Sequence, residues 1–308
     1  MTEIDAFIDT SPEGCIFCRD WWLDAVAPKW EYITIKDKDK PVAIMPIAKY
    51  GRDILMPPLT QTLGIMFTPM QTSYAKTLSR QHQITEEIIE NLPPFRRFEQ
   101  SFHYAYQSFL PFYWHKFHET TRCTYVIHDL NPDRVWDEMR KNIRTDIRKA
   151  ARQAEVSHGS INKEFHKLNA MVYNRLGIPY EQELIDRIEQ ACKKHSACDT
   201  LYARDRKGQI HATIFIVWDN HAAYYLISAA DPELKHSGAT SLLIWEAIRQ
   251  AASITKEFNF EGSMVQEIER HFAAFGARQE KYHQISKSPI VYDMIRKLSS
   301  KMLKKSRD

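Results

Sequence analysis

The sequence predicts an α+β protein whose sheets are mostly antiparallel and flanked by helices. In the second half, three strand-like runs are separated only by short turns: 199–205, 210–218 and 222–230. A run with helical spacing then leads into one more strand-like run. A meander followed by a helix and a further strand is typical of an antiparallel sheet with one crossover connection.

The chain length is enough for two domains. With 308 residues, of which 44% are hydrophobic, the chain can form one large or two medium cores. Strand-like runs at 30–36 and 41–50, joined by the charged turn KDKDK, lie in the first half. A helix-starting pattern at Asn131 begins the second half. We therefore expect an N-terminal domain over residues 1–130 and a C-terminal domain over residues 131–308.

Composition and charge exclude several classes of protein. Lys and Arg total 42 against 39 Asp and Glu, and this net charge of +3 is too balanced for general nucleic-acid binding. No apolar window approaches the roughly 18 residues of a membrane helix. The N-terminus has neither the basic start nor the apolar stretch of a signal peptide. We expect a cytoplasmic protein without a transmembrane segment.

The five cysteines indicate reduced thiols, because an odd number without a secretion signal favours a reducing compartment. Cys15 and Cys18 form a C-x-x-C, whereas Cys192 and Cys198 lack the usual spacing of a zinc pair. No clear strand precedes the first pair, as a thioredoxin-like site would require. We expect buried thiols and no bound metal.

Helices and an irregular segment connect the strands of the first half. Helices over 18–28 and 72–93 each end at a proline. Residues 54–69 contain three prolines and are predicted to form a buried, irregular loop. Two further strands are expected, 96–104 and 121–130.

The segment 104–121 is the most aromatic part of the chain. Aromatic side chains dominate protein interiors, so packing is one interpretation of Tyr113, Trp114 and Phe117. An amphipathic aromatic loop can also line an acceptor pocket. In that second interpretation Trp114 binds substrate.

A basic helix is predicted over 133–155. Its apolar residues recur every four positions and are expected to be buried: Val135, Met139, Ile143, Ile147 and Ala151. Arg144, Arg148 and Lys149 occupy neighbouring faces. These cations either pair with local carboxylates on a solvated helix, or form a surface that binds a phosphate-bearing substrate.

The remaining elements of the second half are mostly helical. Two helices are expected over 163–177 and 180–197, and Gly177 closes the first in a left-handed turn. The later elements are a crossover helix over 240–257, a strand over 257–263, a helix over 266–276, a strand over 280–286 and a basic amphipathic helix over 288–308.

The loop LKHSGATS precedes the crossover helix. The start of a helix offers unpaired backbone N–H groups and a positive dipole end, both of which suit a pyrophosphate. In this segment, called the donor loop, five residues are expected to bind a pyrophosphate-bearing donor molecule: Lys235, Ser237, Gly238, Ala239 and Thr240.

The stretch FNFEGS ends a strand with an acidic residue and a glycine. Gly262 lets the backbone turn where a side chain would collide with a substrate, and Glu261 places a carboxylate at the strand end. That carboxylate can accept the proton that an attacking ammonium must lose. Alternatively, Gly262 is a plain strand exit, and Glu261 and Ser263 are partners of the next helix start.

Three segments together resemble the Fem-type peptidyltransferases and their acetyltransferase-like relatives: NIRTDIRKAARQAE, GATSLLIWEAIRQAA and FNFEGSMVQEIERHFAAFG. The resemblance covers most of the second half, and it covers the first half only loosely, through WWLDAV. It implies tandem acetyltransferase-like (GNAT) domains. It also implies transfer of an acyl group from acyl-CoA or aminoacyl-tRNA to a small-molecule or peptide-like amine, without a stable nucleic-acid complex.

In such a transferase Glu261 is expected to take a proton, and Tyr282 to give one to the departing thiolate or ester oxygen. The chain departs from the family pattern at three places. Lys235 and Thr240 are unusual at the first and last positions of the donor loop. Ala273 stands where Fem enzymes tend to have a lysine, and a coiled-coil arm is missing.

Two other functions stay open. The chain could be a binding module of the same fold, with the basic C-terminal helix touching a membrane surface. The two basic helices also leave an RNA-binding protein as a third hypothesis.

Overall fold

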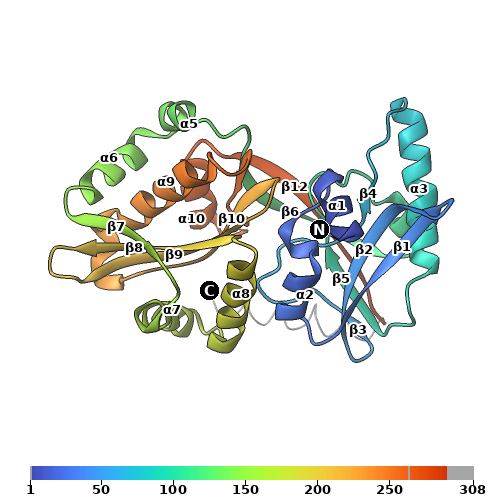
Figure 1. The fold of residues 1–308 in the computed structure, drawn as a ribbon, viewed down its shortest axis with the longest axis horizontal. Helices are drawn as coiled ribbons and strands as arrows, with labels where there is room; N and C mark the ends of the chain where they lie inside the picture. Colours follow the sequence, from blue (N-terminus) through green and yellow to red (C-terminus); the bar gives the residue numbers. More distant parts are fainter. Residues whose placement is uncertain (1, 263, 290–308) are drawn as a thin grey trace, which may run out of the picture. The chain divides into compact units, whose positions relative to one another are not determined.

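The computed structural model describes residues 2–262 and 264–289, which form two compact units (Figure 1). Unit 1 comprises Met1–Cys18, Ala27–Arg122 and Tyr282–Asp308, and unit 2 comprises Arg19–Val26 and Cys123–Lys281, as far as these ranges are described. Each unit combines helices with mostly antiparallel strands, which confirms the α+β class. The domain boundary after residue 130 stays a prediction.

The strands of unit 1 follow the order β1, β2, β3, β5, β12, with β4 paired to β2. Their bounds are β1 (Trp30–Asp37), β2 (Lys40–Tyr50), β3 (Asp53–Ile54), β4 (Met66–Phe67), β5 (Arg97–Ser101) and β12 (Arg278–Lys287). The predicted β1–β2 hairpin is confirmed, and its turn places Lys38 and Asp39 at φ 48° and 68°. Two successive left-handed residues match the twist of a two-residue hairpin.

The helices of unit 1 cover an aromatic core. They are α1 (Glu3–Thr10), the 3₁₀ turn η1 (Ile16–Cys18), α3 (Tyr74–Glu90) and α4 (Leu110–Trp114). In the aromatic segment, Tyr106, Phe112 and Phe117 are buried, which confirms packing as their role. Tyr113 and Trp114 are exposed instead, because they lie on the outer side of the short helix α4.

The strands of unit 2 follow the order β6, β11, β10, β9, β8, β7. Their bounds are β6 (His118–Ile127), β7 (Ala154–Gly159), β8 (Cys198–Asp205), β9 (Ile210–Trp218), β10 (Ala222–Ala230) and β11 (Glu257–Asn259). The predicted meander is confirmed, because β8, β9 and β10 pair antiparallel in sequence order. The strand after the crossover helix pairs parallel to β10.

The helices of unit 2 lie on both faces of its sheet (Figure 1), with α5, α6, α9 and α10 on one face and α7 and α8 on the other. Their bounds are α2 (Asp20–Val26), α5 (Pro132–Glu138), α6 (Lys141–Ala150), α7 (Lys163–Leu176), α8 (Gln182–Lys194), η2 (Pro232–Ser237), α9 (Ala239–Ala251) and α10 (Gln266–Ala273). Gly177 follows α7 at φ 67°, so the predicted left-handed cap is confirmed.

The single basic helix predicted over 133–155 is wrong. The chain leaves the helical conformation at Met139, and the N–H of Arg140 donates instead to the carbonyl of Ala274, so α5 and α6 are separate helices. Residues 154–159 form β7, an edge strand paired to β8. The buried stripe is otherwise as predicted, except that α6 ends at Ala150 and leaves Ala151 exposed.

His128, just after β6, links β11 to the start of β12. Its Nδ1 lies 2.6 Å from Oε1 of Glu257, and its Nε2 lies 2.9 Å from Oε1 of Glu280. Burial lowers the pKa of this imidazole, but hydrogen bonds to the two carboxylates outweigh burial and raise the pKa above its ordinary 6.5. The protonated form is therefore stabilised in the folded protein.

We expect a pH-dependent loss of stability when His128→Gln removes this charge. A pKa that is raised on folding stabilises fully below the unfolded pKa, and the stabilisation is lost as pH rises through the folded pKa. Urea unfolding should therefore separate wild type from the variant more at about pH 6 than at about pH 9. His158→Gln, at a more exposed imidazole that is also paired to a carboxylate, is the control. An equal difference in the free energy of unfolding at both pH values would contradict a stabilising charge on His128.

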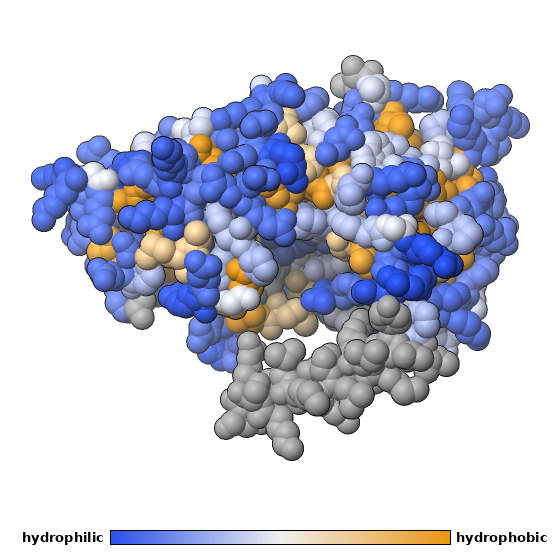
Figure 2. Space-filling view, turned by 90° about the horizontal axis from the view of Figure 1, so that it is seen from below, coloured by the Kyte–Doolittle hydropathy of each residue, from blue (hydrophilic) through white to orange (hydrophobic). Residues whose placement is uncertain are grey.

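The face seen in Figure 2 is largely hydrophilic, with small and separate apolar patches. In the described part of the chain, no helix has the length and apolar character needed to cross a membrane. The predicted cytoplasmic localisation stays a prediction. The basic helix predicted over 288–308 falls almost entirely outside the described residues.

Candidate active site

A cleft opens where the two parallel strands of unit 2 separate. β10 and β11 pair only from Ala222 to Tyr224, against Glu257 to Asn259, and β10 then continues to Ala230 without that partner. The register of β10 against β9 shifts between Tyr225 and Ile227, a β-bulge that bends the strand. Ligands of parallel strand pairs commonly bind at the carboxyl ends of the strands, where such a gap forms.

The cleft is a cavity of about 440 Å³, within the usual size of small-molecule sites. Its lining comes from β10, from the segment after β11, from the first turn of α9 and from α10. The lining residues are Tyr225, Leu226, Ser228, Thr240, Phe260, Glu261, Gly262, Glu267, Ile268, His271 and Phe272. The cavity therefore joins an aromatic wall to several carboxyl, hydroxyl and imidazole groups.

The cavity brings two of the predicted site residues together. Thr240 belongs to the first turn of α9, and Glu261 follows β11, so the crossover connection places both beside one space. The first amides of a helix have no partner within the helix, so α9 offers N–H groups at this end. Negative charge that develops at this end of α9 would be stabilised by the helix dipole.

The corner that carries Glu261 is built by Asn259, which is 1% exposed. Its Oδ1 accepts from the hydroxyl of Thr124 at 2.6 Å and from the N–H of Glu261 at 2.9 Å. Glu261 itself has φ 63°, an uncommon conformation for a residue with a side chain. Asn259 is a positioning residue that was not predicted, although an asparagine two residues before a tight turn is a known signal.

Contacts within the protein explain the glycine at position 262, without reference to a substrate. It has φ 71°, and a Cβ at this position would lie 2.4 Å from the carbonyl oxygen of Cys123 and 2.9 Å from Cα of Thr124. The backbone after β11 therefore runs directly against β6. This close approach, together with the left-handed conformation, explains the glycine.

Gly238 is likewise explained by contacts within the protein. It caps α9 at φ 80°, and a Cβ there would lie 2.5 Å from the carbonyl oxygen of Asp146 in α6. The hydroxyl of Ser237 accepts from the N–H of Ala239 at 3.3 Å. The loop is thus packed on α6 on one side, and Thr240 is the loop residue that lines the cavity. The side chain of Lys235 lies outside the described part of the chain.

The predicted cations of α6 have different surroundings. Nη1 of Arg144 donates to the carbonyls of Trp136 and Asp137 at 3.3 and 3.4 Å, and so caps the end of α5. The guanidinium of Arg148 lies 5.2 Å from the ring centre of Trp136. Nζ of Lys149 donates to the carbonyl of His236 at 2.7 Å and so attaches α6 to the donor loop.

A second, smaller cavity of about 280 Å³ lies along the last turns of α6. It is lined by Thr145, Arg148, Lys149, Arg152 and Gln153. Three cations line one cavity there without a carboxylate among the lining groups. Both the contact from Lys149 to His236 and the packing of Gly238 on Asp146 place α6 beside the start of α9.

Trp114 and Tyr282 belong to unit 1, and neither lines the cavity of Glu261. Trp114 is 49% exposed and packs edge to face against His82, whereas Tyr282 is buried at 8% exposure. The cavity has a phenol of its own, on Tyr225 of β10. Burial raises the pKa of Tyr225 to about 12, so this hydroxyl stays protonated at neutral pH and can donate a hydrogen bond.

His271 is a lining residue that was not predicted. Its Nε2 is buried and has no hydrogen-bond partner among the described residues. Burial lowers the pKa of this imidazole below 6.5, and the charge of Asp146 only partly opposes that effect. In the sequence His271 is one polar residue in an amphipathic helix, so only the fold could reveal its position.

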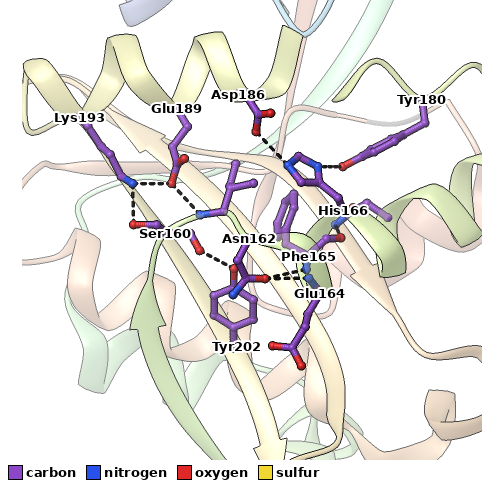
Figure 3. A network of polar contacts seen from close by, with 12 residues as sticks. Ser160, Asn162, Glu164, Phe165, His166, Tyr180, Asp186, Glu189, Lys193 and Tyr202 are labelled. Atoms are coloured by element: carbon purple, nitrogen blue, oxygen red, sulfur yellow. Dashed lines mark hydrogen bonds and ion pairs between the residues drawn. The ribbon is translucent and has the colours of Figure 1, made fainter. Parts of the chain in front are cut away.

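His166, in α7, shows the opposite arrangement (Figure 3). Its Nδ1 lies 2.7 Å from the hydroxyl of Tyr180, and its Nε2 lies 2.9 Å from Oδ1 of Asp186 in α8. Both ring nitrogens are occupied, and the side chain is nearly buried. This group fastens α7 to α8 and has no nitrogen left for a ligand.

One family model matches a part of the chain that contributes to this cavity. Residues 137–260 match the family model described as the acetyltransferase (GNAT) domain. This range contains α6, α9, β10 and β11, and with them the donor loop. A search of curated proteins by sequence finds no significant match.

Solved structures share the fold over most of the chain. FemX has a TM-score of 0.69 at 10% identity, over 92% of this chain and 96% of its own. A tandem GNAT protein from the clavulanic acid biosynthesis pathway has a TM-score of 0.52 at 8% identity, over 87% and 86%. L-PGS from Bacillus licheniformis has a TM-score of 0.51 at 9% identity, over 95% and 94%. The predicted tandem GNAT fold is confirmed, and the resemblance to FemX is confirmed at the level of the fold.

Proposed function

We propose, from the GNAT domain at residues 137–260 and the FemX-like fold, that this chain transfers an acyl group from a phosphate-bearing carrier to an amine. The observation that supports this most is the single cavity lined by Thr240 at the start of α9 and by Glu261 after β11. The start of α9 suits a polarised carbonyl, and the carboxylate of Glu261 suits an amine. Acyl transfer needs both beside one carbon atom.

The carrier would lie along α6. Arg148, Lys149 and Arg152 line a cavity beside the donor loop, and phosphate groups are common partners of such clustered cations. Coenzyme A and the acceptor end of an aminoacyl-tRNA share this chemistry, since both present an acyl group next to phosphates. The cavity suits either donor, so we propose only the feature that both share, an acyl group carried next to phosphates.

The acyl arm would follow the free edge of β10. Beyond Tyr224, no described strand pairs with that edge, so backbone N–H and C=O groups are available to an extended ligand. A pantetheine arm carries amide groups that match such an edge, which supports acyl-CoA as a donor. Tyr225 lines the cavity and would donate its hydroxyl hydrogen to the leaving group, a role that the sequence suggested for Tyr282.

The amine acceptor would meet the carboxylates. Glu261 and Glu267 both line the cavity, and no Lys or Arg is among the lining residues. A carboxylate pair favours a cationic ligand, so an ammonium ion is the form of the acceptor that the cavity would bind. The aromatic wall of Phe260 and Phe272 would pack against the apolar part of either substrate.

A transfer assay tests this function. Purified protein is incubated with a radiolabelled acyl-CoA or a charged tRNA, and with small amines or lysine-containing peptides, and amide product is measured. We expect product with one of the two donor classes, which also distinguishes them. Binding of a donor without any product would favour the binding-module alternative, and neither binding nor product would contradict the proposal.

Charge reversal at the end of α6 and in the turn that follows it should weaken donor binding. The double variant Arg148→Glu, Arg152→Glu is expected to raise the donor Kd by about 10- to 100-fold at low salt, and by less at high salt, because exposed charges are screened. Lys163→Glu, Arg175→Glu makes the same charge change on exposed residues of α7 and is the control. Equal effects of the two double variants in calorimetry would show that only net charge matters.

A further inference from the structure

We propose that His271 is the proton acceptor of the transfer reaction, and that Glu261 and Glu267 hold the amine as its ammonium ion. This inference rests on the proposed function and assigns proton acceptance and ammonium binding to different residues of the same cavity. It moves proton acceptance from the carboxylate predicted from the sequence to an imidazole that the sequence did not single out. All three residues line the cavity.

The position of His271 is unusual for a structural histidine. It lies in the last turn of α10, and its ring packs at right angles to Phe275, with 5.3 Å between ring centres. Its Nε2 is buried but bonds to no described residue. A buried polar atom without a partner is unfavourable, so such an atom beside a cavity points to a ligand. His166, with both nitrogens bonded, is the contrasting case.

Burial favours the neutral form of the His271 imidazole at pH 7, and the nearby negative charge opposes this. Burial in the apolar cluster lowers its pKa, and Asp146 of α6 opposes this with a smaller effect. The other titratable groups that line its cavity are Glu261, Glu267 and Tyr225, and Arg270 is its neighbour in α10. A neutral imidazole can accept a proton, and a base whose pKa is near the working pH is the most effective.

The carboxylates suit a different task. Glu267 lies four residues before His271, so both side chains are on one face of α10, and Glu261 lines the same cavity. Ionised carboxylates accept hydrogen bonds from an ammonium ion and fix its orientation. An ammonium held in this way can present one N–H to the imidazole and then its lone pair to the acyl carbon.

The proton balance of the step is complete. The acceptor ammonium gives up two protons. One passes to Nε2 of His271, which leaves the nitrogen with a lone pair that forms the N–C bond to the acyl carbon. The other passes from that nitrogen to the hydroxyl of Tyr225, which gives its own proton to the departing sulfur or oxygen as the C–S or C–O bond breaks. The imidazolium then releases its proton to water, and no oxidant or metal is required.

The test combines a direct titration with kinetics. The pKa of His271 is measured by NMR of histidine-labelled protein, with the resonance assigned by its absence in His271→Gln. The same variant is assayed for transfer from about pH 5.5 to pH 9, a range that spans an ordinary imidazole pKa. His271→Ala is assayed with and without added imidazole, and His158→Gln on β7 is the control.

We expect a pKa below 6.5 and a rise of wild-type kcat/KM with pH through that value. His271→Gln should lower kcat by about 100-fold or more, leave the KM of the amine nearly unchanged and remove the acid limb of the profile. Imidazole should partly restore His271→Ala. A pKa at or above 6.5, or a variant that keeps its kcat and its acid limb, would overturn the proposal while the transferase function stands. A wild type without turnover on any donor would overturn both.

Discussion

Glu261→Gln is expected to lower kcat/KM of amide formation by about 100-fold or more. The substitution keeps the size of the side chain and removes the negative charge that would hold the ammonium ion. Loss of one partner from a desolvated charge pair costs about 2–5 kcal/mol, which corresponds to roughly 30- to several thousand-fold. The loss should fall mainly on the KM of the amine, measured by steady-state kinetics with a saturating donor.

The kinetic split of Glu261→Gln also separates two roles. A loss confined to kcat, with the KM of the amine unchanged, would restore Glu261 as the proton acceptor and contradict its role as the ammonium-binding group. Glu183→Gln, on the exposed start of α8, is the matched control and should leave both constants unchanged. Equal unfolding midpoints of the two variants would exclude a folding defect.

Gly262→Ala is expected to destabilise the protein by about 2–4 kcal/mol. About 1 kcal/mol arises from a side chain in the left-handed region, at φ 71°. The larger part arises because the new Cβ would meet the carbonyl oxygen of Cys123 at 2.4 Å, a backbone atom that cannot move alone. Overpacking of this kind adds about 1–3 kcal/mol. The free energy of unfolding in urea measures the sum.

The control for this prediction is Gly177→Ala. Gly177 has φ 67°, but a Cβ added there would meet no described atom within 4 Å apart from its chain neighbours, so only the conformational term of about 1 kcal/mol applies. If Gly262→Ala costs no more than Gly177→Ala, the close approach to β6 does not constrain the corner. Folded Gly262→Ala protein should also lose transfer activity, because the displaced corner carries Glu261.

Local pattern predicted most of the secondary structure of unit 2. The meander, the crossover helix and the cap at Gly177 depend on short-range periodicity and on glycine conformation, and all three are confirmed. The break between α5 and α6 was missed because its cause is not local. The N–H of Arg140 bonds to Ala274, which is more than a hundred residues away in sequence.

The site was only partly predictable for a similar reason. That Thr240 and Glu261 would line one cavity followed from the order of the elements, since a crossover helix starts near the end of the strand to which it leads. The roles of Gly238 and Gly262 did not follow, because the atoms that they avoid belong to α6 and β6. His271 could not be found either, since a free ring nitrogen is a property of packing.

A structure with a non-reactive analogue of the donor, bound together with an amine, would show whether the cavity of Thr240 and Glu261 is the site of transfer. We expect the acyl carbon to lie in the cavity of Thr240 and Glu261, with the carrier phosphates beside Arg148 of α6 and Arg152 of the turn that follows it. An acyl group bound outside that cavity, or a start of α9 closed off by protein side chains in the complex, would contradict this expectation.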